Sequence, residues 1–360
     1  CCELSRHPAR PFMKPNHRAV VAALEQNISK SKTLVNKDQQ HLRDLRDESE
    51  RDATWDDHRN FGDKIEAMAR RAGYEQYAAR VRDCATSLFY GPKVDTETGE
   101  WTLRLKSAHF CHFRHCPICQ WRRSMRNKAR FLERVEEVQA AFPKARWLML
   151  TLTVRNCAIA DLRSTIENMN RAWRALLKRP EFSQVQGWVR AVEVTRGRDG
   201  SAHPHYHVLL MVPPSYFSHG FVKTARWSEI WGECLKIDYV PICDARAVRP
   251  KMVKSDNGQI IEAKAPLSAA AAEVVKYATK SEDMLKGGPD WFAEYIEQVH
   301  GLKFLTSGGA LKGIFKDKES DEELIHTDDE NDAESADNDA DKMLRFDWYK
   351  ARKRYSRKVR

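Results

Sequence analysis

The sequence predicts an α+β protein built on one antiparallel sheet with the ferredoxin-like split β-α-β order, preceded by a helical region that contains a cysteine cluster. Three observations lead to this prediction. Within residues 140–285, apolar runs with the alternation of a strand are interspersed with amphipathic stretches of helical period. Two strand-like runs, 187–196 and 205–212, flank a loop of Gly, Asp and Ser, which is typical of a hairpin. Three of the nine cysteines fall within residues 111–119.

The elements of the central region follow one another as β-α-β-β-α-β, so helices are expected on one face of the sheet. Before them, a helix at 63–83, broken near Gly73, leads directly into Cys84. After them, a helix at 266–282 begins with a proline, as helices often do. The expected central elements are a strand at 145–154, a helix at 161–179, strands at 187–196 and 205–212, a helix at 223–236 and a strand at 239–248.

The charge of the chain points to a polyanionic partner. The formal net charge is +10, but residues 317–342 alone hold thirteen acids and two lysines, so the rest of the chain carries +21. No apolar run approaches the roughly 20 residues of a membrane span, and no membrane partner is expected. With no signal peptide in the sequence, we expect a cytoplasmic, reducing location, where clustered cysteines indicate a metal site more often than disulfides.

The cysteine cluster has the spacing of a zinc site. Residues 111–124, CHFRHCPICQWRRS, place Cys111, Cys116 and Cys119 close together, and the CPIC step lets two thiolates bind one tetrahedral ion. Cys84 is the expected fourth ligand. Competing candidates for a ligand are His109, His112 and His115, and the alternative is a set of reduced surface cysteines.

A basic amphipathic helix follows the cluster directly. Its cations are expected to contact DNA phosphates, although a solvated charged face would have the same pattern. These cations are Arg122, Arg123, Arg126, Lys128 and Arg130.

The second hairpin strand carries a pair of histidines. Because side chains alternate along a strand, His205 and His207 project from one face, opposite the face that packs on the helices. A hairpin centred near Gly200 places Glu193 opposite His207, and a carboxylate in that apolar strand is costly unless it is paired or bound to metal. The three residues are therefore candidate ligands of a divalent metal such as Mg²⁺ or Mn²⁺, against the alternative of a solvated histidine face. His203 is expected at the mouth of the strand.

The helix at 266–282 carries three groups suited to covalent phosphate chemistry. Glu273, Tyr277 and Lys280 lie at i, i+4 and i+7, within about a 60° arc of a helix. A phenol with an unperturbed pKa near 10 is a poor nucleophile at neutral pH. A nearby ammonium and a metal both favour the phenolate. The alternative is a tyrosine packed on the sheet between a solvated glutamate and lysine.

Three of these stretches resemble the motifs of HUH-type endonucleases, in particular the rolling-circle replication initiators of small bacterial plasmids. They are HPHYHVLL (203–210), LTLTVRN (150–156) and EVVKYATK (273–280), and the segment CPICQWRRS resembles the end of a cysteine-rich segment in the same family. The similarity extends over roughly residues 80–285. It implies the HUH endonuclease fold, a metal bound by His205 and His207, Tyr277 as nucleophile, Lys280 as its supporting lysine and Glu273 as the glutamate of the single-tyrosine branch.

The resemblance implies a bacterial nickase that cuts one strand of origin DNA, forms a 5′-phosphotyrosine and releases a 3′-OH for replication. Its partners would be duplex origin DNA, the single-stranded nick site and host replication proteins such as a helicase. A mobilisation relaxase or single-strand transposase would use the same chemistry. A non-catalytic, zinc-dependent DNA-binding regulator is the alternative without enzyme activity.

Composition and motifs together predict six segments. The first residues are polar with a thin apolar stripe, and are expected to be helical or partly disordered. The segments are an arm at 1–78, a zinc-binding segment and basic helix at 79–135, the endonuclease domain at 140–285, an extension at 286–316, an acidic linker at 317–342 and a basic tail at 343–360.

Overall fold

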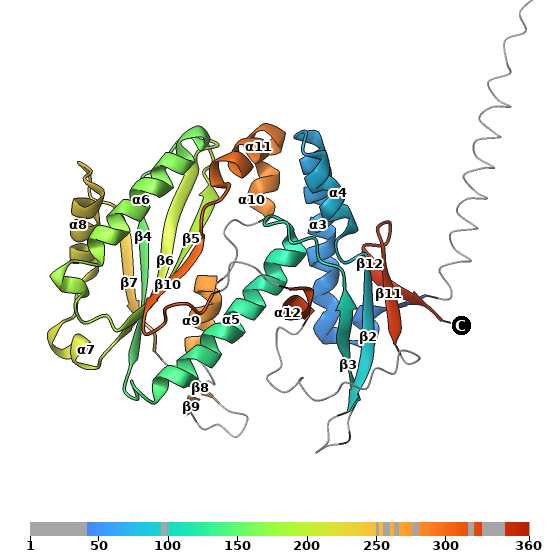
Figure 1. Cartoon of the computed structure of the whole chain (residues 1–360), viewed down its shortest axis with the longest axis horizontal. Helices are drawn as coiled ribbons and strands as arrows, with labels where there is room; N and C mark the ends of the chain where they lie inside the picture. The colour runs from blue at the N-terminus through green and yellow to red at the C-terminus, as the bar shows by residue number, and fades with distance from the viewer. Residues whose placement is uncertain are drawn as a thin grey trace, which may run out of the picture.

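The structure is a computed structural model of the whole chain, and it has an elongated outline with one five-stranded sheet toward each end (Figure 1). It describes residues 42–94, 99, 101–249, 252–254, 260–262, 266–275, 281–315, 320–325 and 343–359. Among these residues, no helix is long and apolar enough to cross a membrane.

The larger region is built on the sheet β10-β5-β6-β4-β7, in which every pair of neighbouring strands is antiparallel. Four of its strands have the predicted ferredoxin-like order, β5-β6-β4-β7. The helices α6 and α8 lie between these strands in the chain. β10 extends the sheet beside β5. The bounds are β4 Arg146–Thr153, α6 Leu162–Leu176, β5 Gly187–Arg196, β6 Ala202–Val212, α8 Thr224–Leu235, β7 Cys243–Ala247 and β10 Leu305–Gly309.

Helices pack on both faces of this sheet, not on one as the sequence pattern suggested (Figure 1). On the first face, α6 and α8 bury Trp173, Trp227 and Trp231 against strand residues such as Leu150 and Tyr206. On the second, α9 (Pro266–Val275) and α5 (Pro117–Gln139) form a smaller core. That core contains Phe131, Val189, Ala191, Leu209, Ala271, Val274 and Leu311. The histidine face is therefore partly covered, because its apolar positions need burial as well.

The smaller region is built on a second antiparallel sheet, in the order β1-β12-β11-β2-β3. Its strands come from both ends of the described chain, and the C-terminal strands pair with β1 on one side and β2 on the other. The two helices α3 and α4 replace the predicted broken helix, with Gly73 between them at a φ of +83°. The bounds are β1 Leu42–Asp44, α3 Thr54–Arg71, α4 Glu75–Asp83, β2 Ser87–Val94, β3 Trp101–Ala108, β11 Leu344–Tyr349 and β12 Arg354–Lys358.

The arm and the tail expected from the sequence thus contribute to one sheet where the structure describes them. Trp55, Phe346 and Tyr355 are all at most 1% exposed in its core. This pairing joins residues about 300 positions apart in the chain, and no local pattern in the sequence indicated it. The six predicted segment boundaries themselves remain predictions.

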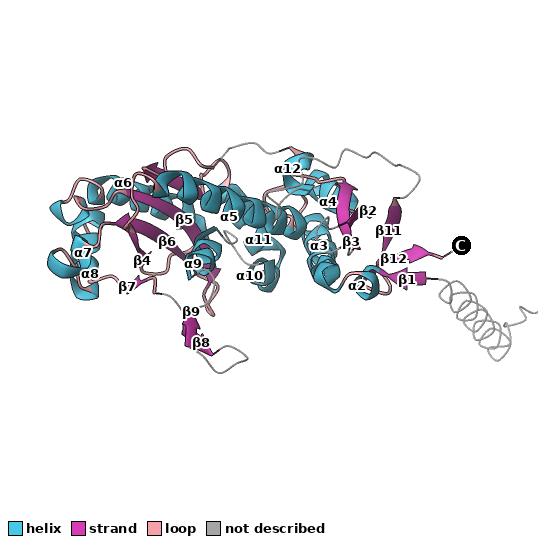
Figure 2. Cartoon of the chain, turned by 90° about the horizontal axis from the view of Figure 1, so that it is seen from below, coloured by secondary structure: helices cyan, strands magenta, loops and turns pink. Residues whose placement is uncertain are grey.

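The long helix α5 connects the two regions (Figures 1 and 2). Its first turn lies beside α3 and β3, and its later turns lie beside α9 and the larger sheet, where Phe131 contacts Trp147 edge-on. The remaining elements are α2 Leu45–Glu48, the 3-10 turns Glu50–Ala53, Ile159–Asp161 and Pro180–Phe182, α7 Ser215–His219, β8 Met252–Lys254, β9 Ile260–Glu262, α10 Ser281–Lys286, α11 Gly288–Val299 and α12 Asp321–Ile325.

Candidate functional site

Glu193, His205 and His207 form one compact group on the second face of the larger sheet. The Oε2 atom of Glu193 lies 2.9 Å from Nε2 of His207 and 3.7 Å from Nε2 of His205. All three ligand atoms lie within 4.8 Å of one another, so they could hold a metal ion. Glu193 is 4% exposed, whereas the side chains of His205 and His207 are 11% and 14% exposed. The group is therefore held in the sheet but remains reachable from one side.

The strand register differs from the prediction. Glu193 pairs with His205, and His207 pairs with Ala191, because the hairpin is centred one residue earlier than Gly200. A shift of one residue in the centre moves the partner by two positions. Since side chains alternate with a period of two, Glu193 still points to the same face as both histidines. The predicted register was wrong, but the predicted set of ligands comes together.

The backbone and a threonine hold the far sides of the two imidazole rings. The Nδ1 of His205 donates to the carbonyl of His203 at 3.2 Å, which leaves its Nε2 free to accept or to bind a cation. The Nδ1 of His207 lies 3.5 Å from Oγ1 of Thr151 on the neighbouring strand β4. Such contacts orient ligand rings and fix their tautomers. Thr151 was not among the predicted site residues, although it lies in the stretch LTLTVRN.

Helix α9 packs against the same face, next to this group. Val274 and Val275 are 1% and 5% exposed, and the apolar face of the helix contacts Ala191, the cross-strand partner of His207. Glu273 lies on the opposite, exposed side of this helix. Tyr277 and Lys280 lie outside the described residues, which resume at α10.

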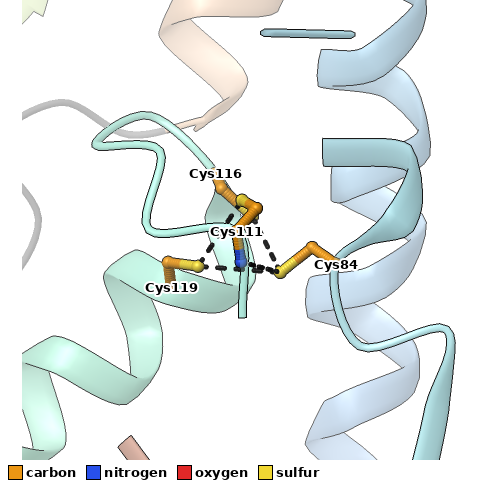
Figure 3. Close-up of side chains that lie close together, drawn as sticks. All are labelled: Cys84, Cys111, Cys116 and Cys119. Carbon is orange, nitrogen blue, oxygen red and sulfur yellow. Dashed lines mark hydrogen bonds between the residues drawn. The ribbon is translucent and has the colours of Figure 1, made fainter. Parts of the chain in front are cut away.

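The four predicted cysteines meet in a second, fully enclosed group (Figure 3). Cys84 follows α4, Cys111 follows β3, Cys116 caps α5, and Cys119 lies in its first turn. Their side chains point toward one another, and none is more than 6% exposed. The group ties the ends of three elements together.

The spacing of the sulfurs fits a tetrahedral metal. Sγ of Cys119 lies 3.6 Å from that of Cys84 and 3.7 Å from that of Cys111, and Cys84 and Cys116 are 3.7 Å apart. A tetrahedron with Zn–S bonds of about 2.3 Å has edges of about 3.8 Å. Hydrogen bonds from the three neighbouring thiols hold the pKa of the Cys111 thiol well below its usual range. The same contacts, together with burial, raise the pKa of the Cys84 and Cys119 thiols. One thiolate, the form that binds metal, is thus favoured at Cys111, and a bound cation would be needed to favour it at Cys84 and Cys119.

The competing histidines have other environments. His112 Nε2 contacts Asp321 Oδ1 at 2.5 Å, and the backbone of His112 is left-handed, with a φ of +51°. His115 is 3% exposed and packs edge-on against Phe113 and Tyr295, where burial lowers its pKa to about 3. His109 is exposed at the end of β3. The four-cysteine group is complete without them.

The cations of α5 do not all face solvent. Arg122, which is 5% exposed, donates to the carbonyls of Leu324 and Ile325 at 2.6 Å each. Arg130, which is 6% exposed, pairs with Glu323 at 2.6 Å. All three partner residues lie in α12, near the start of the acidic stretch. Arg123, Arg126 and Lys128 are partly exposed, and Arg126 is paired with Glu133 at 3.2 Å.

Comparison with known proteins now decides the family. The profile of a family described as "Replication protein" matches residues 102–356, which is most of the chain. The chain belongs to this family, the Rep_1 replication proteins of plasmids. The match includes the Glu193, His205 and His207 group and three of the four cysteines. Cys84 precedes it.

Individual proteins that are similar to this chain are also replication proteins by name. The chain is 33% identical over 264 residues to "Protein rep" of Lentilactobacillus hilgardii, which covers 70% of this chain and 80% of that protein. It is 33% identical to "Protein rep" of Bacillus amyloliquefaciens, with 71% and 78% covered. It is 31% identical to "Protein rep" of Streptococcus pneumoniae, with 78% and 86% covered. No solved structure matches the chain.

Proposed function

We propose that this Rep_1 protein initiates replication by nicking one strand of origin DNA, with Tyr277 as the nucleophile. The observation that carries the proposal is the group of Glu193, His205 and His207, with Glu193 Oε2 within 3.7 Å of Nε2 of both histidines. A buried carboxylate between two imidazoles is expensive without a cation to share. Membership in a family of replication proteins supports DNA as the substrate class.

A divalent ion such as Mg²⁺ or Mn²⁺, when bound by these three residues, would polarise the scissile phosphate. The residues of the chain do the rest. The phenolate oxygen of Tyr277 attacks the phosphorus and forms a bond to it. The bond from the phosphorus to the 3′ oxygen breaks, which leaves a 5′-phosphotyrosine and, after protonation, a free 3′-OH. Because one phosphate ester replaces another, the bond energy is retained for later strand joining.

Helix α9 supports the position proposed for the nucleophile. Val274 of this helix is buried in the core on the sheet face that carries the two histidines, three residues before Tyr277. We propose that Lys280 favours the phenolate and that Glu273 activates the water of a terminating cut. The exposure of Glu273 on α9 is compatible with a role in contact with solvent and DNA.

We further propose that the four-cysteine group binds a structural Zn²⁺. The support is the sulfur spacing of 3.6–3.7 Å and the burial of all four residues. Closed four-thiolate sites of this kind stabilise folds and do not react.

The decisive experiment incubates the full chain with Mn²⁺ and a single-stranded oligonucleotide carrying the plasmid nick site, and looks for an adduct that survives denaturation. We expect no adduct with Tyr277→Phe, since the attacking oxygen is gone, and normal adduct with the control Tyr349→Phe in β11. Glu273→Gln should form the adduct but fail to terminate, so that single-stranded product exceeds unit length. Adduct from Tyr277→Phe would move the nucleophile to another tyrosine.

The two variants separate two roles. Unit-length product from Glu273→Gln would remove this residue from the mechanism and leave it as a surface partner of a lysine on its helix, worth a few tenths of a kcal/mol. Loss of the first nick in Glu273→Gln would instead assign it to Tyr277 as a base.

A further inference from the structure

The sheet β1-β12-β11-β2-β3 has two unequal faces. One face packs on α3 and buries Leu88, Tyr90, Leu105, Phe346 and Tyr355, each at most 9% exposed. In Figures 1 and 2, α3 and α4 lie on that side, and none of the helices that the structure describes lies on the other. We call this second side the outer face.

The outer face is rich in cations. Its residues follow from strand alternation and from the cross-strand pairs. These pairs are Gly91 with Arg104, Phe89 with Arg345, and Asp347 with Ser356. Arg345 and Lys358 are exposed, while Lys93, Arg104 and Lys106 are partly exposed. The acids on this side are engaged: Asp347 lies 2.8 Å from Arg345, and Asp44 lies 3.0 Å from Arg352. By this alternation the outer face includes Asp44, Phe89, Gly91, Lys93, Arg104, Lys106, Arg345, Asp347, Tyr349 and Lys358.

The outer face presents mainly charged side chains. A methyl group on Gly91 would lie 3.1 Å from Cγ of Lys106, so the aliphatic part of this lysine crosses over the glycine. Phe89 lies under the guanidinium of Arg345, 5.8 Å from the ring centroid. Lys106 is the extra residue of a β-bulge opposite Phe89 and Tyr90, a feature that re-aims side chains.

We propose that the outer face binds the phosphate backbone of duplex DNA that flanks the nick site. The inference rests on the proposed function, which makes origin DNA the substrate. Duplex is favoured over single-stranded DNA because proteins that bind single strands stack successive bases on exposed aromatic rings. Of the two rings on this face, Phe89 lies under Arg345, and Tyr349 is a single, partly exposed ring at the end of β11. The two sheets lie toward opposite ends of the molecule, so duplex bound here leaves the Glu193, His205 and His207 group open to the strand that is cut (Figure 1).

The test compares two triple variants of the full chain with equal loss of charge. One removes three outer-face cations (Lys106→Gln, Arg345→Gln, Lys358→Gln). The other removes three cations at the far end of the larger region, on and after α6 (Arg171→Gln, Arg174→Gln, Lys178→Gln), all of them exposed. Binding to a fluorescent duplex and to its top strand alone is measured over a series of salt concentrations. Zinc content and thermal unfolding show whether each variant is folded. If the triple outer-face variant does not fold, the single variant Lys106→Gln is measured in its place.

For the outer-face variant we expect duplex affinity to fall by roughly tenfold or more. The slope of log affinity against log salt should shrink by about 2 to 3, since each phosphate contact contributes about 0.9. Lys106→Gln alone should reduce the slope by about 1. The α6 variant should keep the parent slope, and the outer-face variant should still cleave a single-stranded oligonucleotide.

Three results would overturn the proposal: a parent slope in the outer-face variant, an equal loss in the α6 variant, or an equal loss of single-strand binding. The first result would mean that the outer face does not contact duplex phosphates. The second would mean that the loss of affinity reflects only the change in net charge. The third would mean that the outer face binds single strands as well as it binds duplex. If the parent protein itself fails to cleave but the outer-face variant still loses duplex binding, the nicking proposal fails and this one stands.

Discussion

The two groups that could bind metal differ in how completely they surround the ion. The four cysteines offer four sulfurs and are at most 6% exposed. Glu193, His205 and His207 offer three ligands, with the histidine side chains 11% and 14% exposed. Closed sets of four thiolates are typical of structural sites, whereas catalytic sites keep a position open for substrate. The difference in burial therefore matches the two proposed roles, a structural site for the cysteines and a catalytic site for the other group.

The two groups also differ in what they connect. The cysteines come from the ends of α4 and β3 and the start of α5, which are joined by individual contacts such as the hydrogen bond from Arg80 to the carbonyl of Cys111 and not by a continuous ladder. The other three residues come from β5 and β6, which are already joined by a continuous antiparallel ladder. Loss of metal should accordingly loosen the first region and leave the second folded.

The largest effect is expected from Cys116→Ser. Structural zinc sites supply folding energy of about 10 kcal/mol or more in small domains, so loss of one thiolate should release the metal and destabilise this region by several kcal/mol. Elemental analysis and thermal unfolding measure both. Cys234→Ser, at a half-buried cysteine outside the group, is the matched control and should keep its zinc. Full zinc content in Cys116→Ser would contradict the assignment.

His207→Ala should reduce nicking without destabilising the fold. Metal polarisation is worth several kcal/mol in a transition state, and each 1.36 kcal/mol is a factor of ten, so nicking should fall by about 1000-fold or more. The unfolding temperature and zinc content should remain near those of the parent. In the parent, mild EDTA should stop nicking and added Mg²⁺ or Mn²⁺ should restore it without refolding. If chelation removed activity only together with the fold, the two sites would not be separable.

The sequence predicted those features that are encoded locally. The β-α-β-β-α-β order is confirmed because each element has its own periodicity, and the CPIC step with Cys84 after a helix located the cysteine group. The ligand set of the histidine group survived a wrong register because a shift of two positions preserves the face of Glu193.

What the sequence missed depends on contacts between distant segments. The pairing of β11 and β12 with β1 and β2 joins the two ends of the chain, and no periodicity encodes a partner. The basic face of α5 looked uniform, but α12, some 190 positions later, buries Arg122 and Arg130. Helix α9 covers part of a sheet face that alternation alone suggested was open.

Thr151→Val tests whether a neighbouring side chain orients one of the histidines of the Glu193, His205 and His207 group. Valine keeps the shape of threonine but cannot hold the Nδ1 of His207, so the ring is less well oriented. Loss of such a supporting contact typically costs 10- to 100-fold in metal affinity, and at a distance of 3.5 Å we expect the lower end, roughly tenfold. The metal concentration for half-maximal nicking measures this. Thr153→Val is the control, because its hydroxyl donates to the carbonyl of Ile242, and an equal change there would exclude a specific role for Thr151.

The smallest expected effects concern α5, which links the two sites. Lys128 is partly exposed, whereas Arg130 is held by Glu323 at 2.6 Å. If Lys128 contacts phosphate, Lys128→Gln should lower duplex affinity a few-fold and reduce the salt slope by about 1. Arg130→Gln should instead leave the slope unchanged and lower the free energy of unfolding by about 1–3 kcal/mol, the usual cost of losing a charged hydrogen bond. Salt-dependent DNA binding and denaturant unfolding of the two variants distinguish these outcomes. A reduced slope in Arg130→Gln would mean that α12 leaves the helix when DNA binds, because only then could this guanidinium reach a phosphate.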